Sequence, residues 1–122
     1  MAEVEGIPAI ADYGIIGDGR TAALCSSAGS IDWMCVPRFD SHPIFGRLVG
    51  GEGAGSFSVG VEDRVATTRR YREGSAVLQT MWQTPHGSVR LTEGMVLDVE
   101  GRLLPQRLLV RRWRQTMARV EP

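Results

Sequence analysis

The sequence predicts an all-β protein, an incomplete antiparallel β-sandwich with one short helix near residues 42–49. Two observations carry this prediction. Runs in which apolar and polar residues alternate recur along the chain, as in Phe57–Val61, Val65–Arg72 and Ser88–Leu97. Turn signals such as Glu73-Gly74-Ser75 stand between them. Several short strands separated by turns in this way are typical of antiparallel sandwiches and barrels.

The first strands are predicted to include a hairpin. The run Ala9–Gly17 is rich in β-forming residues and ends in a Gly-Asp-Gly turn. Two apolar runs follow, Thr21–Cys25 and Ile31–Val36, and the short segment that joins them consists of small residues with one glycine, which is a hairpin signal. Pro37 cannot donate to a sheet ladder, so the second strand should end there.

A short helix is predicted after this hairpin. Ser41 suits the N-cap and Pro43 suits the first turn, so the helix is expected over Ile44–Val49. Gly50-Gly51 should end it, because glycine readily adopts the left-handed conformation in which helices stop.

The second half of the chain predicts further strands. Ala76–Thr84 and Ser88–Leu97 read as neighbouring strands around the turn at Pro85. The residues that share one face of each strand are Ala76, Leu78, Thr80 and Trp82, and Val89, Leu91, Glu93 and Met95. Leu103-Leu104 and Leu108–Trp113 should be the last strands, separated by a proline.

Composition argues against several classes of partner. The 122 residues suffice for one domain, and 14 basic residues balance 14 acidic ones, so no net field attracts nucleic acid or an anionic membrane. No apolar run approaches the roughly 18 residues that cross a bilayer. The N-terminus lacks the basic and apolar regions of a secretory signal, so a cytoplasmic location is expected.

The two cysteines, Cys25 and Cys35, are predicted to be unpaired. In the expected hairpin Cys25 lies opposite Ile31 or Asp32, which leaves Cys35 roughly 10–13 Å away at about 3.3 Å per residue. Disulfide partners need Cα atoms within about 7 Å, so we expect two reduced, packed thiols. No cluster of Cys or His indicates a metal site, and no cofactor is expected.

The segment after the hairpin brings a cation, an aromatic ring and a carboxylate to one strand end, at Arg38, Phe39 and Asp40. Loops at strand ends often carry sites. Together with Trp33, these residues suit sugar binding, in which rings stack on C–H faces and charged groups bond hydroxyls. The alternative is structural, with Trp33 in the core and the charged pair stabilising a loop or an interface.

Other motifs favour structural interpretations. Gly17–Ala22 fits G-x-G-x-x-A, but a helix after it would be too short for a dinucleotide-binding crossover, so a plain turn is favoured. Arg69–Arg72 is interpreted as a solvated strand edge rather than an RNA patch. The carboxylates that suit glycoside hydrolysis by type are Asp12, Asp18, Asp32, Asp40 and Glu93. Nothing in the sequence pairs two of them at the spacing that hydrolysis needs, and solvated or turn-forming roles are favoured.

Seven stretches of the sequence match the pattern of one known domain, and they occur in the same order as in that domain. They are Ile10–Tyr13, Ile16–Leu24, Gly29–Ser41, Phe45–Leu48, Tyr71–Leu78, Leu91–Met95 and Gly101–Arg112. The most specific of them is GSIDWMCVPRFDS. On these stretches the chain resembles the N-terminal domain of bacterial glycoside hydrolase family 15 proteins, the trehalase-like and glucoamylase-like enzymes.

The resemblance implies a non-catalytic β-sandwich that precedes an (α/α)6 barrel carrying a pair of catalytic glutamates. It implies no catalytic residue in this chain and a sandwich of which the later strands are missing. We therefore expect a tail at residues 1–8, an incomplete trehalase-like domain at 9–113 and an irregular tail at 114–122.

Two functions are compatible with this resemblance. In the first, the chain is the accessory domain, or a fragment, of a glycosidase acting on trehalose or α-glucans, supports a barrel in the same polypeptide, and is not an enzyme alone. In the second, it is an orphan carbohydrate-binding or interaction module without hydrolase activity. Half a sandwich leaves an edge and a face uncovered, so the isolated chain should be marginally stable or self-associating.

Overall fold

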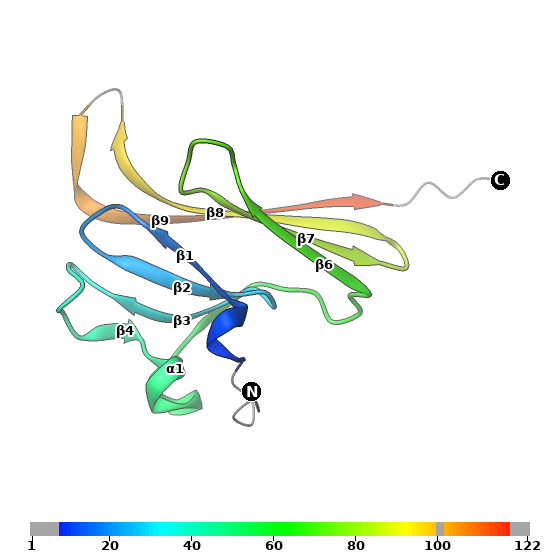
Figure 1. Ribbon diagram of the computed structural model, residues 1–122, viewed down its shortest axis with the longest axis horizontal. Coiled ribbons are helices and arrows are strands. Elements are labelled where there is room, and N and C mark those ends of the chain that lie inside the picture. The colour runs from blue at the N-terminus through cyan, green and yellow to red at the C-terminus, as the bar shows by residue number, and fades with distance from the viewer. Residues whose placement is uncertain (1–7, 100–101, 118–122) are drawn as a thin grey trace.

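The fold consists of two antiparallel sheets stacked in two layers, which confirms the predicted sandwich class (Figure 1). The computed structural model describes residues 8–99 and 102–117, with side chains described except at 97–99, 103–107 and 117. The elements in chain order are η1 (Ile10–Asp12), β1 (Tyr13–Gly17), β2 (Ala22–Ser26), β3 (Ser30–Cys35), β4 (Pro43–Phe45), α1 (Arg47–Gly50), η2 (Glu52–Ala54), β5 (Phe57–Ser58), β6 (Ala66–Tyr71), β7 (Leu78–Thr84), β8 (Gly87–Val99) and β9 (Arg102–Met117).

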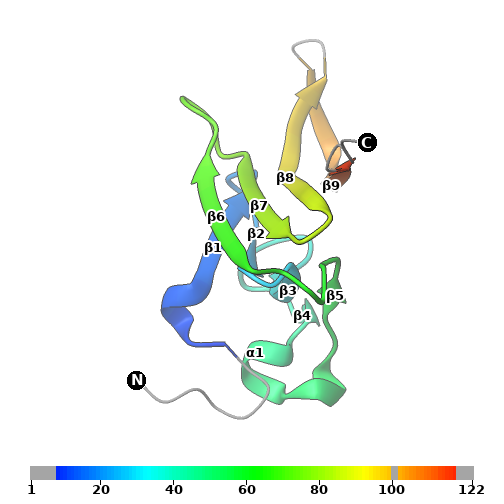
Figure 2. The same cartoon turned by 90° about the vertical axis from the view of Figure 1, so that its right-hand side faces the viewer.

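The two layers divide the chain into halves. The first sheet has the strand order β1-β2-β3-β4, with β5 also paired to β3, and the second has the order β6-β7-β8-β9. Figures 1 and 2 both place α1 at the end of the first sheet that lies away from the second sheet. Among the described residues, no helix combines the length and the apolar character needed to cross a bilayer.

The predicted hairpin is confirmed. Strands β2 and β3 pair antiparallel, and Cys25 lies opposite Ile31. Cys25 and Cys35 are free and buried, as expected. Gly29, in the connecting turn, has φ 92°, a conformation that glycine adopts without strain because it has no Cβ. Strand β3 then ends at Cys35, just before the predicted stop.

The predicted short helix exists but begins later than expected. Pro43–Phe45 forms β4 and pairs with the end of β3, and α1 covers only Arg47–Gly50. Pairing with β3 satisfies backbone groups that the first turn of a helix would have left open. The hydroxyl of Ser41 accepts a bond from the amide of Arg38 instead of capping a helix. The expected glycine stop is present, with φ 76° at Gly51.

The last strand is continuous, which corrects the prediction of two strands separated by Pro105. Strand β9 is the edge of its sheet, where a missing N–H is tolerated. Its register with β8 shifts between Val96 and Asp98. The strand also runs on to Met117, beyond the expected start of the irregular tail at residue 114. Of the expected N-terminal tail, residues 1–7 lie outside the described residues.

The core lies between the two sheets and contains most of the faces predicted for β7 and β8. Ala76 is the exception, because it precedes β7 and is exposed. One buried cluster joins Leu78 of the second sheet to Ile16, Ala23, Cys25, Ile31 and Met34 of the first. A second cluster consists of Trp82, Val89 and Leu91, with Val59 and Val61 packed against it. The Nε1 of Trp82 donates to the carbonyl of Ser27 at 2.8 Å, so a buried ring also holds the hairpin turn against the second sheet.

Candidate functional site

The loop after β3 is a compact surface turn. The amide of Ser41 donates to the carbonyl of Arg38 at 3.0 Å, and the amide of Phe39 donates to the carbonyl of Arg20 at 3.1 Å. Arg38 Nε and Asp40 Oδ1 lie 3.3 Å apart, with side chains 70% and 74% exposed. Such an exposed ion pair contributes little to stability, so the charges of this pair face water.

The two aromatic residues of the predicted site meet in an apolar hollow of the first sheet. Trp33 and Phe39 line a hollow of about 140 Å³, completed by Ile15, Thr21, Ala22, Leu24 and Cys35. Phe39 as a whole is 62% exposed. The structure thus brings together two of the four predicted residues, Trp33 and Phe39, while Arg38 and Asp40 pair with each other in the adjoining loop.

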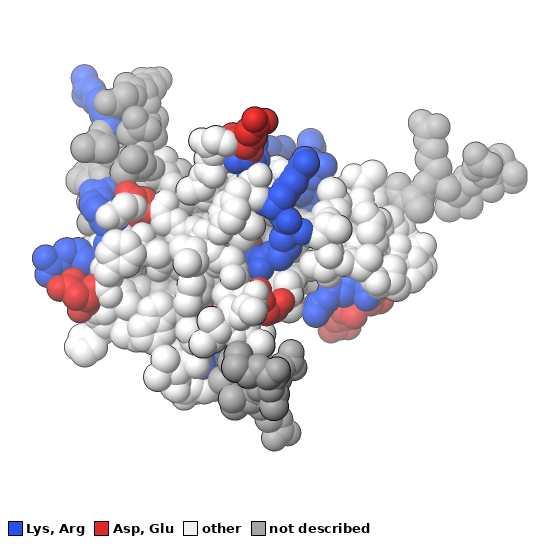
Figure 3. Space-filling view, in the orientation of Figure 1, with Lys and Arg blue, Asp and Glu red and all other residues white. Residues whose placement is uncertain are grey.

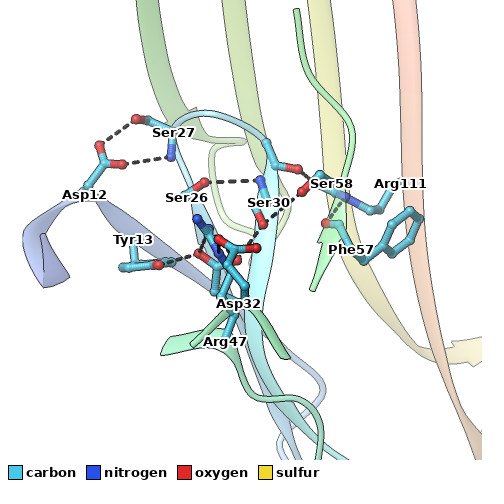
Figure 4. A network of polar contacts seen from close by, with 12 residues as sticks. Asp12, Tyr13, Ser26, Ser27, Ser30, Asp32, Arg47, Phe57, Ser58 and Arg111 are labelled. Atoms are coloured by element: carbon cyan, nitrogen blue, oxygen red, sulfur yellow. Dashed lines mark hydrogen bonds and ion pairs between the residues drawn. The ribbon is translucent and has the colours of Figure 1, made fainter. Parts of the chain in front are cut away.

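Asp32, the residue before this tryptophan, is the centre of a buried polar network (Figure 4). Its carboxylate accepts bonds from the hydroxyls of Tyr13 and Ser30 and from Arg47 Nη1, the last at 3.2 Å. Arg47 Nε also donates to Glu52 at 2.7 Å. The network therefore joins β1, β3, α1 and η2.

The pKa values of Tyr13 and Arg47 are both raised, which keeps the two hydrogen-bond donors of this network protonated. Burial, followed by the hydrogen bond to Asp32, raises the pKa of the Tyr13 phenol. Burial alone would lower the pKa of Arg47, but its hydrogen bonds to Glu52 and Asp32 outweigh that effect and raise it. The phenol therefore stays protonated and the guanidinium stays charged near neutral pH, and both donate to one carboxylate. This arrangement stabilises the fold and offers no group that would readily give up a proton in catalysis.

A second buried ion pair lies between the sheets. Arg111 Nε on β9 donates to Glu93 Oε2 on β8 at 2.8 Å, and the two side chains are 3% and 0% exposed. The same guanidinium donates to the carbonyls of Phe57 and Gly29, both in the first half of the chain, and lies 4.8 Å from the Phe57 ring centre. Burial, followed by the charge of Glu93, raises the pKa of the nearby Cys25 thiol.

The remaining candidate carboxylates also have structural partners. Asp12 accepts bonds from the amide and hydroxyl of Ser27. Asp18 Oδ1 accepts from the amides of Arg20 and Thr21 at 2.9 and 3.0 Å, an arrangement typical of an Asx turn. Within the described residues, no group of three or more His, Cys, Asp or Glu side chains gathers to hold a metal ion.

Sequence reasoning missed the partners of the buried carboxylates. Alternation places Glu93 on a strand face with Leu91 and Met95, and a carboxylate on such a face needs a cation. Arg111 shares the corresponding face of β9 because it lies opposite Glu93 in the register. The sequence does place Arg111 on one strand face with Leu109 and Trp113. Only the register shows that this face of β9 lies beside Glu93. Nothing in the sequence indicated that Arg47 would reach Asp32.

Comparisons with known proteins agree with this domain type. A family described as "Trehalase-like, N-terminal" matches residues 4–92. The trehalase of Mycolicibacterium smegmatis is 45% identical over 91 residues, which is 74% of this chain and 14% of that protein. The trehalase of Mycobacterium tuberculosis is 40% identical over 100 residues, 78% of this chain and 15% of that protein. That of Thermoplasma volcanium is 36% identical over 96 residues, 75% of this chain and 15% of that protein.

The alignments cover only a small part of these relatives, since the matched region spans about 14% or 15% of each. No solved structure matches the chain. The match to the family ends at residue 92, so Glu93 and the whole of β9, with Arg111, follow the matched segment.

Proposed function

Because this chain belongs to the trehalase-like N-terminal family, we propose that it is the non-catalytic accessory domain of a family 15 glycoside hydrolase acting on trehalose or α-glucans. In this proposal the chemistry belongs to a catalytic (α/α)6 barrel in the same polypeptide, which this domain supports. The proposal also places the protein in the cytoplasm, a location that two free, buried cysteines suit.

The observation that carries the proposal is the state of the carboxylates. Each of the five acidic residues that suited hydrolysis by type has a structural partner: Asp12 with Ser27, Asp18 with a turn, Asp32 with Tyr13 and Arg47, Asp40 with Arg38, and Glu93 with Arg111. A glycosidase needs one carboxylic acid and one free carboxylate on either side of a substrate bond. An accessory role is consistent with relatives of which the matched region is only 14% or 15%.

A chimera tests the accessory role. In the trehalase of M. smegmatis, the aligned segment is replaced by the corresponding residues of this chain, and trehalose hydrolysis and solubility are compared with those of a deletion of the segment. We expect the chimera to be soluble and active, and the deletion to lose both properties. Hydrolysis of trehalose by the 122-residue chain alone would refute the non-catalytic role.

A second function, carbohydrate binding, is favoured only by the hollow at Trp33 and Phe39. Its volume of about 140 Å³ is below the roughly 300–1,000 Å³ typical of pockets that enclose small molecules, so it can serve only as a shallow platform. Titration with trehalose and maltotriose, followed by tryptophan fluorescence, tests this function. Binding that Trp33→Ala abolishes and Trp113→Ala preserves would support it, and an unchanged signal would exclude it.

A further inference from the structure

The outward side of the second sheet is strongly basic. One cross-strand row joins Arg70, Gln79, Thr92 and Arg112, and the next joins Thr68, Met81, Arg90 and Arg114. The alternate positions, which include Leu78, Trp82 and Leu91, are buried between the sheets. The two rows therefore lie on the other side of the sheet. With Arg72 just beyond β6, we call this surface the arginine face.

The arginine face concentrates charge in a chain that has none overall. It carries five arginines, namely Arg70, Arg72, Arg90, Arg112 and Arg114, whereas the whole chain balances 14 basic with 14 acidic residues. All five are exposed. In Figure 3, blue side chains gather over β6 and β7, with red side chains only beyond the ends of the group. The two rows contain no acidic residue, and Glu73 lies only at the rim.

Three open hollows run across this face, with volumes of about 330, 590 and 370 Å³. Gln79 lines all three of them, so they form one trough between the arginine side chains. The trough offers guanidinium, amide and hydroxyl groups, the last from Thr68 and Thr92. Guanidinium groups pair bidentately with carboxylates.

The arginines on the inward side of the same sheet have hydrogen-bond partners within the protein. Arg69 donates to Thr80 and to the carbonyls of Asp12 and Cys25, and Arg111 holds Glu93. By contrast, Arg90 and Arg114 lie directly opposite each other in the register, where like charges destabilise a sheet. An anionic partner would relieve this repulsion.

The composition of the face favours a protein surface as that partner. Leu108 and Val110 share a face of β9 with Arg112, because the three positions are two residues apart. They are 46% and 43% exposed, and Met81 lies within the arginine rows. Arginine and methionine beside exposed apolar side chains are typical of protein interfaces. The two rows contain no aromatic ring. Tyr71 lines one hollow, but its hydroxyl is bonded to the backbone of Ile15 in the first sheet. The lack of rings in the rows argues against single-stranded nucleic acid, because that ligand is bound by stacking.

We infer that the arginine face docks an acidic surface of the catalytic domain in the same polypeptide, an inference that rests on the proposed function. The positive charge of the five exposed arginines selects an acidic occupant. A second copy of the chain would place one arginine face against another and oppose ten arginines, which like-charge repulsion disfavours. In the proposed protein the catalytic domain is covalently linked, so its carboxylates are present at a high effective concentration.

Arginine-specific labelling with phenylglyoxal tests the docking in the M. smegmatis chimera, extended to include β9. The five arginines of the face should be protected, and Arg38 and Arg64, which are exposed elsewhere, should be labelled. Equal labelling of all seven in the folded chimera would overturn the inference. So would protection that appears only when inorganic polyphosphate is added, because the face would then bind a free polyanion.

Charge reversal provides an independent measurement. The triple variant Arg90→Glu, Arg112→Glu, Arg114→Glu should separate the unfolding of this domain from that of the rest in calorimetry, and the control Arg38→Glu, Arg64→Glu should not. Raising NaCl from about 0.05 to about 0.5 M should lower the melting temperature of the parent chimera more than that of the triple variant. Identical behaviour of triple and control would overturn the docking. Loss of trehalose hydrolysis in the unmutated chimera counts against the proposed function alone, since labelling is read without activity.

Discussion

At the scale of single residues, Arg111 bonds β9 of the second sheet to the first half of the chain. Its guanidinium neutralises the buried Glu93 and satisfies carbonyls of Phe57 and Gly29 in the first half of the chain. Glu93 Oε1 has no hydrogen-bond partner among the described residues. The buried Glu93 therefore relies on Arg111 to neutralise its charge.

Replacing that cation should be strongly destabilising. Arg111→Met leaves the carboxylate of Glu93 buried and unpaired, which typically costs about 3–5 kcal/mol. Urea unfolding, followed by circular dichroism, measures the change. The control Arg112→Met, at the next and exposed position, should change stability by less than about 0.5 kcal/mol. Adding Glu93→Leu to Arg111→Met should recover part of the loss. A double variant as unstable as the single one would show that the stranded charge is not the cause.

The thiol of the buried Cys25 and the phenol of the half-buried Tyr13 should make stability fall at alkaline pH. Burial and Glu93 raise the pKa of Cys25 in the folded state above its usual 9.0, and burial and Asp32 raise the pKa of Tyr13 above its usual 10.0. Above these values the unfolded chain loses protons that the folded chain keeps, so stability is full below about pH 9 and declines as the pH rises. The chain contains no lysine, so few other groups titrate in this range.

Substituting Cys25 and Tyr13 should remove this loss of stability at alkaline pH. In the native sequence, each retained proton raises the unfolding equilibrium constant by up to about tenfold per pH unit. The double variant Cys25→Ala, Tyr13→Phe should show a flatter profile from about pH 8 to about pH 11, whatever its stability at pH 7. Parallel profiles for the two proteins would contradict the assignment.

At the scale of elements, the turn between β2 and β3 is the point where the first sheet meets the second half of the chain. A Cβ added at Gly29 would collide with the carbonyl oxygen of Val59 and would lie 2.9 Å from the Trp82 ring. The Gly29 carbonyl also accepts from Arg111. The hairpin turn must therefore stay small and left-handed for the sheets to approach each other.

A pair of glycine substitutions separates the cost of a positive φ from the cost of steric crowding. Gly19 has φ 87°, and no described atom lies within 4 Å of the place that a Cβ would take there, whereas Gly29 has φ 92° in a crowded site. Gly19→Ala should cost about 1 kcal/mol for backbone strain alone, and Gly29→Ala should cost clearly more. Thermal unfolding of the two variants gives the difference. Equal losses of stability would mean that the backbone at Val59 moves aside for the added methyl group at little cost.

At the scale of the whole molecule, the second sheet extends beyond the cover that the first provides. Trp113 lies opposite the fully buried Leu91 on the face that points inward, yet it is 45% exposed. Strand β9 is also an edge of its sheet, and it spans 16 residues. A long edge beside exposed apolar side chains is a site for association.

The isolated chain should therefore associate as its concentration rises. Sedimentation velocity over a wide concentration range should show a growing share of dimers or larger species, and Trp113→Glu should reduce it by adding charge to the exposed inward face of β9. Trp33→Glu, on the first sheet, is the matched control. A monomer at every concentration, with a sharp cooperative thermal transition, would count against this prediction.

The sequence by itself determined most of the strands, the hairpin turn and the domain type. Alternation at Leu78, Trp82 and Leu91 records which side of a strand is buried, because side chains of a strand alternate between faces. The spacing of Cys25 and Cys35 sufficed to predict free thiols, and GSIDWMCVPRFDS sufficed to identify the family, since local patterns survive without knowledge of the partner strand.

Only the tertiary structure decided which distant residues meet. The placement of β4 before α1 depended on pairing with β3, which outweighed the local capping signals at Ser41. The contacts of Arg111 with Glu93 and Gly29, of Arg47 with Asp32, and the row that aligns Arg70 with Arg112 all depend on register and sheet stacking. A shift of one residue in strand register would send side chains such as Arg111, Arg70 and Arg112 to the opposite face of their sheet, and local sequence does not encode that choice.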